Sequence, residues 1–111
     1  MAYDEALATR IRALVSEQPG LTEQRMFGGL AFLINGNMAV SASSAGGLLL
    51  RVPPEQTAEL AGRPHAQRFA MRGREMEGWL RVDPDGLGTK HELEQWVSLG
   101  VTYARQLPPK R

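Results

Sequence analysis

The sequence predicts an α+β fold, in which one two-layer domain packs helices against an antiparallel sheet of about five strands. Three observations support this fold class: helical periodicity at both ends, short apolar segments between them, and separating turns rich in Gly, Pro and Asn. A chain of 111 residues has room for one modest core. We therefore expect a single domain over residues 1–106, in the order helix, three strands, short helix, two strands, helix, and a frayed tail at 107–111.

The two terminal helices have clear signals. Residues from about 4 to 17 place apolar side chains on one stripe, with Asp4 as the N-cap and a Pro-Gly pair as the stop. Thr89 and Glu92 have the spacing of a capping box, which predicts that the last helix starts there. Its apolar stripe continues to about Gln106.

The apolar run over residues 26–34 predicts a strand, and the Asn35-Gly36 pair after it predicts a hairpin turn. Two registers fit this turn. A two-residue loop pairs Leu33 with Met38. A three-residue loop, with Asn37 in the left-handed region, pairs Ile34 with Met38 instead.

Burial favours the three-residue loop, because a slip of one residue moves every side chain to the other face. In this register Phe32 pairs with Val40. One face then holds five large apolar side chains and the other holds three small ones, namely Leu30, Phe32, Ile34, Met38 and Val40 against Ala31, Ala39 and Ser41.

Shorter elements complete the predicted domain. We expect strands at residues 48–52, 67–71 and 76–82. Pro53-Pro54 suits the first turn of a short helix that ends before Gly62. The segment 83–86 has the composition of a turn.

The composition excludes several kinds of protein. The chain has no cysteine, which rules out disulfides, thiolate catalysis and Cys-ligated metals. A net charge of +1 gives no strong overall field for nucleic acid or membranes. The N-terminus carries acidic residues early, unlike a secretory signal, and no segment is apolar enough to span a bilayer. We therefore expect a cytoplasmic protein.

The adjacent Gly28 and Gly29 raise the question of a phosphate-binding loop. Such a loop leads into a helix N-terminus, whereas these glycines precede the rest of a predicted strand and a hairpin. Glycine within a strand more often marks a bulge, a bend or a close approach of another backbone. We interpret the pair as structural and expect no cofactor.

Catalytic and metal sites have little support. His65 and His91 are the only histidines, and their separation is not that of a paired metal site on one helix. The carboxylates near them lie in turns or beside arginines. We expect no metal and no enzyme activity. A ligand-binding or enzymatic domain around His65, with Asp83 or Glu77, is an alternative that requires these groups to converge in one pocket.

Basic residues gather in the last two predicted strands and their connections, namely Arg63, Arg68, Arg72, Arg74 and Arg81. Arg68, Arg72 and Arg74 are the candidates for contact with a phosphate backbone. The simpler interpretation is a charged hairpin end that keeps a sheet edge soluble. Contact with nucleic acid therefore stays an alternative.

Trp79 points to a protein interface. Alternation within residues 76–82 places Trp79 and Arg81 on the face opposite Leu80, and the strand pairing adds three apolar side chains to that outer face: Phe27, Leu33 and Leu49. Trp and Arg are enriched in interfaces. A helix that crosses this face would be the simpler explanation. The simplest interface would form a homodimer.

Several of these segments resemble one protein family. The segments Arg25-Met26-Phe27-Gly28-Gly29, 35–38 and 48–52 resemble the N-terminal domain of the TfoX/Sxy competence regulators. The segments 64–66, 72–79 and 96–110 resemble small standalone members, so the likeness covers nearly the whole chain. The family pattern carries Met26, Phe27, Gly28 and Gly29 over as signature positions and supplies no catalytic residues.

The resemblance implies a compact α/β domain in a bacterial cytoplasm, without a known cofactor. Full-length regulators of this family act in transcription of DNA-uptake genes through protein partners, and they carry a second, C-terminal domain that we expect this chain to lack. We therefore expect a non-enzymatic regulatory or adaptor module that works by protein–protein contact, with a transcription-related protein as a possible partner.

Overall fold

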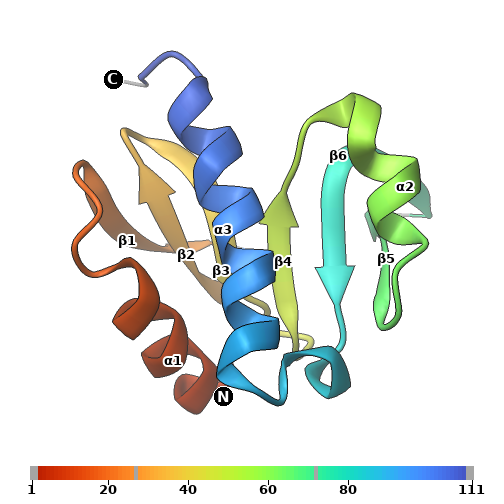
Figure 1. Cartoon of the computed structure of the whole chain (residues 1–111), viewed down its shortest axis with the longest axis horizontal. Helices are drawn as coiled ribbons and strands as arrows, with labels where there is room; N and C mark the ends of the chain where they lie inside the picture. The colour runs from red at the N-terminus through yellow and green to blue at the C-terminus, as the bar shows by residue number, and fades with distance from the viewer. Residues whose placement is uncertain (1–2, 27, 72, 110–111) are drawn as a thin grey trace.

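A six-stranded antiparallel sheet forms one layer of the molecule, and helices form the other (Figure 1). The computed structural model describes residues 3–26, 28–71 and 73–109, and these counts refer to that part of the chain. The strand order is β1-β2-β3-β4-β6-β5. The strands are β1 (Leu21–Met26), β2 (Gly29–Ile34), β3 (Asn37–Ala42), β4 (Leu48–Arg51), β5 (Ala66–Met71) and β6 (Arg74–Val82). The predicted α+β class with an antiparallel sheet is confirmed.

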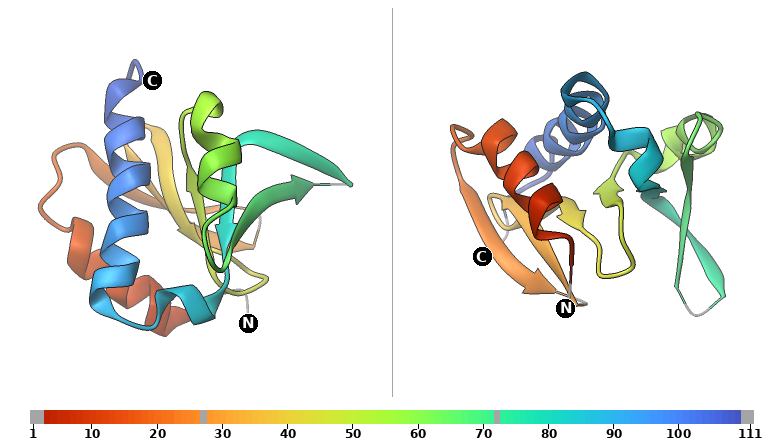
Figure 2. Two further views of the ribbon diagram at one scale, coloured as in Figure 1. Left: turned by 45° about the vertical axis from the view of Figure 1, so that its right-hand side comes forward. Right: turned by 90° about the horizontal axis from the view of Figure 1, so that it is seen from below.

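All helices lie on one face of the sheet, as the two views of Figure 2 show. The α-helices are α1 (Glu5–Val15), α2 (Thr57–Ala61) and α3 (Lys90–Gln106), and two 3₁₀ turns are η1 (Pro54–Gln56) and η2 (Pro84–Leu87). α1 and α3 pack over the half of the sheet that contains β3, while α2 packs on β5 and β6. No helix within the described residues is long and apolar enough to cross a membrane.

The main core fills the space between the helices and the sheet. Side chains from α1, α3 and the inward positions of the strands are almost wholly removed from solvent there. The largest of them are Ile11, Val15, Phe32, Ile34, Val40, Leu48, Leu50, Val52, Leu80, Val82, Leu87 and Leu93. Burial of this apolar surface is the dominant stabilising term of the fold.

Both predicted helix caps are present. The Asp4 carboxylate accepts hydrogen bonds from the backbone N–H groups of Ala6, at 2.9 Å, and of Leu7, at 3.2 Å. At α3 the Thr89 hydroxyl accepts from the Glu92 N–H at 3.1 Å, and the Glu92 carboxylate accepts from the Thr89 N–H at 3.0 Å. The capping box thus satisfies two backbone donors that an uncapped helix leaves without partners.

The predicted strand over residues 26–34 is wrong in its boundary. β1 ends at Met26 and β2 begins at Gly29, so Gly28 lies in the turn of a hairpin and has a φ of +78°. That backbone conformation favours glycine. β1 adds a sixth strand that the sequence analysis did not include. Its central residues are exposed and polar, so it lacks the apolar pattern that reveals a strand.

The hairpin between β2 and β3 corrects the predicted loop. Asn35 and Gly36 both have positive φ angles, 53° and 84°, which are typical of a two-residue type I′ turn. Leu33 therefore pairs with Met38, and the three-residue loop is wrong. The expected pairing of Phe32 with Val40 is nevertheless confirmed, because the register shifts between Phe32 and Leu33.

This shift moves two side chains to the faces opposite to those predicted. Ala39 packs in the main core under the helices, and Met38 packs on the other side of the sheet. A β-bulge explains both changes, since one extra residue in β3 reverses the alternation locally. The chain thus keeps the preferred turn at Asn35-Gly36 and still buries Phe32 and Val40 in the main core.

Candidate functional site

The face of the sheet opposite the helices, called the outer face from here on, carries a second apolar cluster. Four buried side chains form it, and three partly buried ones pack against them. This outer cluster consists of Ala31, Leu33, Met38 and Leu49, with Met26, Phe69 and Trp79 packed around them. No described helix lies over this face, so the strands themselves cover these side chains (Figure 2).

A cavity of about 230 Å³ opens into the outer cluster. Each of the six strands contributes to its wall, including the two edge strands through Met26 and Phe69. Residues from both edges can line one cavity because the two ends of the sheet extend away from the helix layer (Figure 2, right). The wall is lined by Met26, Gly29, Met38, Ser41, Ser43, Ser44, Ala45, Leu49, Phe69, Met76 and Trp79, none of which is charged.

Gly78 directs the Trp79 side chain toward the outer face. Its φ is +89°, its N–H donates to the Thr57 hydroxyl at 2.8 Å, and its carbonyl accepts from the Val52 N–H at 2.9 Å. Trp79 then packs in the outer cluster, while Leu80 packs in the main core. The predicted assignment of these two side chains to opposite faces is confirmed.

Three of the five predicted interface residues lie together. Leu33, Leu49 and Trp79 belong to the outer cluster. Leu33 and Leu49 are 8% and 9% exposed, so they support the floor of this surface, whereas half-buried Trp79 offers more of its ring to solvent. Phe27 lies outside the described residues.

Arg81, the fifth predicted interface residue, is held within the chain. Its guanidinium donates to the Asp83 carboxylate at 2.6 Å and to the Gly46 carbonyl at 2.7 Å. A further hydrogen bond joins it to the Ala45 carbonyl at 3.1 Å. Arg81 therefore fixes the loop between β3 and β4, and this loop forms part of the cavity wall.

The arginine that accompanies Trp79 is Arg51, which the sequence analysis missed. Arg51 and Trp79 are cross-strand neighbours, and the Arg51 guanidinium carbon lies 5.4 Å from the centre of the Trp79 ring. The same carbon lies 5.8 Å from the centre of the Tyr103 ring on α3. Alternation from Leu49 would have placed Arg51 on the same face, which is the signal that could have found it.

The predicted nucleic-acid residues are divided among different environments. The Arg68 guanidinium lies 2.9 Å from the Glu77 carboxylate and 3.9 Å from that of Glu75. Arg74 is exposed, and Arg72 lies outside the described residues. Arg63 lies over the Trp96 ring at 5.7 Å, on the helix side. Nucleic-acid contact stays a prediction, and the charge of Arg68 is already matched by carboxylates.

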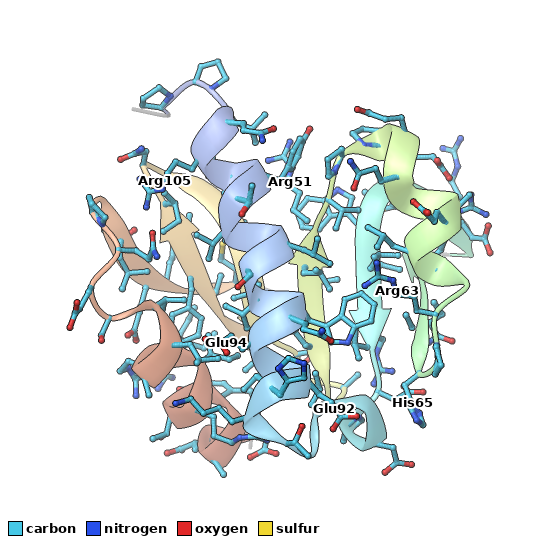
Figure 3. The ribbon with its side chains drawn as sticks, viewed as in Figure 1. Arg51, Arg63, His65, Glu92, Glu94 and Arg105 are labelled. Carbon is cyan, nitrogen blue, oxygen red and sulfur yellow. The ribbon has the colours of Figure 1, made fainter. Side chains whose placement is uncertain are left out.

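The groups proposed around His65 do not form a pocket with the cavity. His65 is exposed, with a φ of 67°, and its carbonyl accepts from the Asp83 N–H at 2.9 Å. Glu77 is paired with Arg68, and His65 lies at the end of the molecule away from Arg51 (Figure 3). Across the described ranges, no group of three His, Asp or Glu side chains could hold a metal ion.

Gly28 and Gly29 belong to the hairpin that forms the cavity rim. Gly28 lies in its turn, and a Cβ atom at Gly29 would collide with the Ala42 carbonyl oxygen of β3. Gly29 is thus needed for the close approach of β2 and β3. The structural interpretation of the pair is supported by this packing, although the position of Gly28 differs from the prediction.

Comparison with known proteins gives one match. The sequence model of the TfoX N-terminal domain matches residues 13–104, from within α1 almost to the end of α3. No curated protein and no solved structure matches the chain. The match spans nearly the whole sequence and includes all six strands of the sheet. This chain therefore belongs to the family of TfoX N-terminal domains.

Proposed function

We propose that this chain is a non-enzymatic regulatory or adaptor module, similar in role to competence regulators, and that it acts by protein–protein contact through the outer face. Membership of the TfoX N-terminal domain family supports the regulatory part of this proposal. The resemblance to proteins that work through partners supports contact rather than chemistry as the mode of action.

One observation carries the choice of surface. The outer cluster and its cavity lie on the sheet face that the described helices leave open, with Trp79 half-buried at the edge of the cavity. Monomeric proteins rarely leave large apolar patches without a use, and buried aromatic anchors dominate the energy of interfaces. The uncharged wall of the cavity contains no acid or base for catalysis, which also favours binding.

Affinity capture from the native host tests this proposal, with the wild type, Trp79→Asp and Leu99→Asp as baits. Leu99 is a partly buried apolar residue of α3 on the opposite side of the molecule, so Leu99→Asp introduces the same charge away from the outer face. We expect one protein to be recovered by the wild type and by Leu99→Asp and lost with Trp79→Asp. Equal recovery by all three folded baits would show that the outer face is not the contact surface.

The contact could also be made by a second copy of the chain. A homodimer through the outer face would bury Trp79 of both copies around a twofold axis. Sedimentation of the wild type and Trp79→Asp over a range of concentrations decides this point. A dimer that dissociates in Trp79→Asp supports self-association, and a monomer for both variants leaves the surface for another protein.

A further inference from the structure

Arg51 is held between two aromatic rings at the end of β4. Its guanidinium carbon lies 5.4 Å from the centre of Trp79 on β6 and 5.8 Å from the centre of Tyr103 on α3. It lies beside the C-terminal half of α3 (Figure 3). A guanidinium that stacks on aromatic rings keeps the N–H groups along its edge, and its orientation is fixed before any ligand arrives.

The charge of Arg51 has no counter-charge in the described part of the chain. Arg12, Arg68 and Arg81 each form an ion pair with a carboxylate, whereas Arg51 forms none. Its contacts are with the two rings only. Because Arg51 is half-buried, an anion that reaches it would meet a partly desolvated and ordered cation, which strengthens the interaction.

Trp79 connects Arg51 with the cavity, because the ring that carries the guanidinium also forms part of the cavity wall. The cavity has a volume of about 230 Å³. Sites for drug-sized ligands and cofactors are commonly about 300–1,000 Å³. The cavity is therefore better matched to one large apolar side chain than to a cofactor, and its three methionines allow the wall to adapt to that side chain.

We propose that Arg51 and the cavity together recognise a segment of another protein that carries a carboxylate next to a large apolar side chain. The carboxylate binds the edge of the Arg51 guanidinium, and the apolar side chain enters the cavity on the outer face. The inference rests on the proposed function and specifies the chemistry of its partner.

Charge decides against a second copy as this partner. The carboxylates near the outer face are already used within the chain, since Glu77 pairs with Arg68 and Asp83 pairs with Arg81. A second copy that used one of them for Arg51 would leave its own arginine without a partner. A different protein that brings its own carboxylate avoids this cost.

Selection from a library of random short peptides tests the proposal, with folded wild type and Arg51→Gln as separate targets. We expect the wild type to enrich peptides in which Asp or Glu lies close to Phe, Leu, Trp or Met. Arg51→Gln should keep the apolar preference and lose the acidic one. If no peptide is enriched, the proposed contact surface itself fails. If apolar peptides without acidic residues are enriched equally by both targets, the outer face binds proteins but the role of Arg51 is overturned.

The affinity of the best enriched peptide then isolates the charged contact without altering the fold. Replacing its acidic residue by the matching amide should weaken binding to the wild type by about tenfold, as expected for a charge-assisted hydrogen bond. The same replacement should have little effect on binding to Arg51→Gln. Equal losses for both proteins would overturn the proposal. Binding of labelled chain to itself that competes with the peptide would instead identify a second copy as the occupant.

Discussion

Gly28 and Gly29 are adjacent, but different physical requirements select glycine at each position. Gly28 is exposed in the β1–β2 turn, and its φ of +78° is a conformation that other residues rarely adopt. Gly29 is buried in β2, where the carbonyl of Ala42 and the hydroxyl of Ser41 occupy the space that a side chain would need. Substitution is therefore costly through backbone strain at Gly28 and through steric overlap at Gly29.

Gly29→Ala should lower the free energy of unfolding by roughly 1–3 kcal/mol, because β3 must move to admit one methyl group. Denaturant unfolding followed by circular dichroism measures this change. Gly62→Ala is the matched control, since an added Cβ there makes only an ordinary contact at 3.4 Å. Equal stability of Gly29→Ala and the wild type would contradict the close approach described for β2 and β3.

At the scale of the element, α3 depends on its capping box. Thr89→Ala removes the acceptor for the Glu92 N–H and should cost about 1 kcal/mol of stability. Thr89→Ser keeps the hydroxyl and should stay close to the wild type. Chemical denaturation of the three proteins measures the difference. If the alanine and serine variants lose stability equally, the methyl group of Thr89 matters more than its hydrogen bond.

The link between α1 and β1 gives the fold a pH-dependent contribution. Arg12 Nε donates to Glu23 Oε2 at 2.7 Å, and Arg12 Nη2 donates to Glu23 Oε1 at 3.0 Å. The hydrogen bond from Arg12 lowers the pKa of Glu23 below that of a free glutamate. A lowered pKa stabilises the folded chain above the unfolded pKa of about 4.3, and the contribution is lost as the pH falls through the folded-state pKa.

Glu23→Gln should therefore lower the melting temperature slightly at neutral pH, and its melting temperature should converge with that of the wild type in acid. The effect is small because both side chains are partly solvated, and added salt should reduce it further. Thermal melts across a pH series test this, with Glu17→Gln as a control for the loss of one exposed carboxylate. A difference that stays constant with pH would mean that the ion pair is not its source.

The predictability of each element follows from where its signal lies. α1 and α3 were predicted from local signals, because their caps and apolar stripes are formed by residues near one another in the sequence. β1 was not, since an edge strand with exposed Thr22 to Arg25 is defined by its pairing with β2. The bulge in β3 was also missed, because the chain resolves the competition between turn geometry and burial only in three dimensions.

At the scale of the whole molecule, the sheet separates stability from the proposed contact. Its inner face carries the main core under all the described helices, and its outer face carries the outer cluster and cavity. Trp79, Leu33 and Leu49 were assigned to one face from alternation alone. The role of Arg51 and the fixed position of Arg81 could not be, because both depend on how the strand ends approach α3 and the β3–β4 loop.

Leu49 and Leu50 are neighbours in β4 on opposite faces, and together they test this separation. Leu50→Ala leaves a hole in the closed main core and should cost about 2–5 kcal/mol. Leu49→Ala only widens a cavity that already exists, so the loss should be smaller, roughly 1–2 kcal/mol from the apolar surface no longer buried. Denaturant unfolding gives both values.

Binding should show the opposite order. Leu49→Ala removes part of the cavity wall, so the folded variant should bind the captured partner or the enriched peptide more weakly than the wild type. Leu50→Ala, measured at a temperature where it remains folded, should bind like the wild type because its side chain does not reach the outer face. If Leu50→Ala weakens binding as much as Leu49→Ala does, the two faces are coupled, and binding then depends on the packing of the whole sheet.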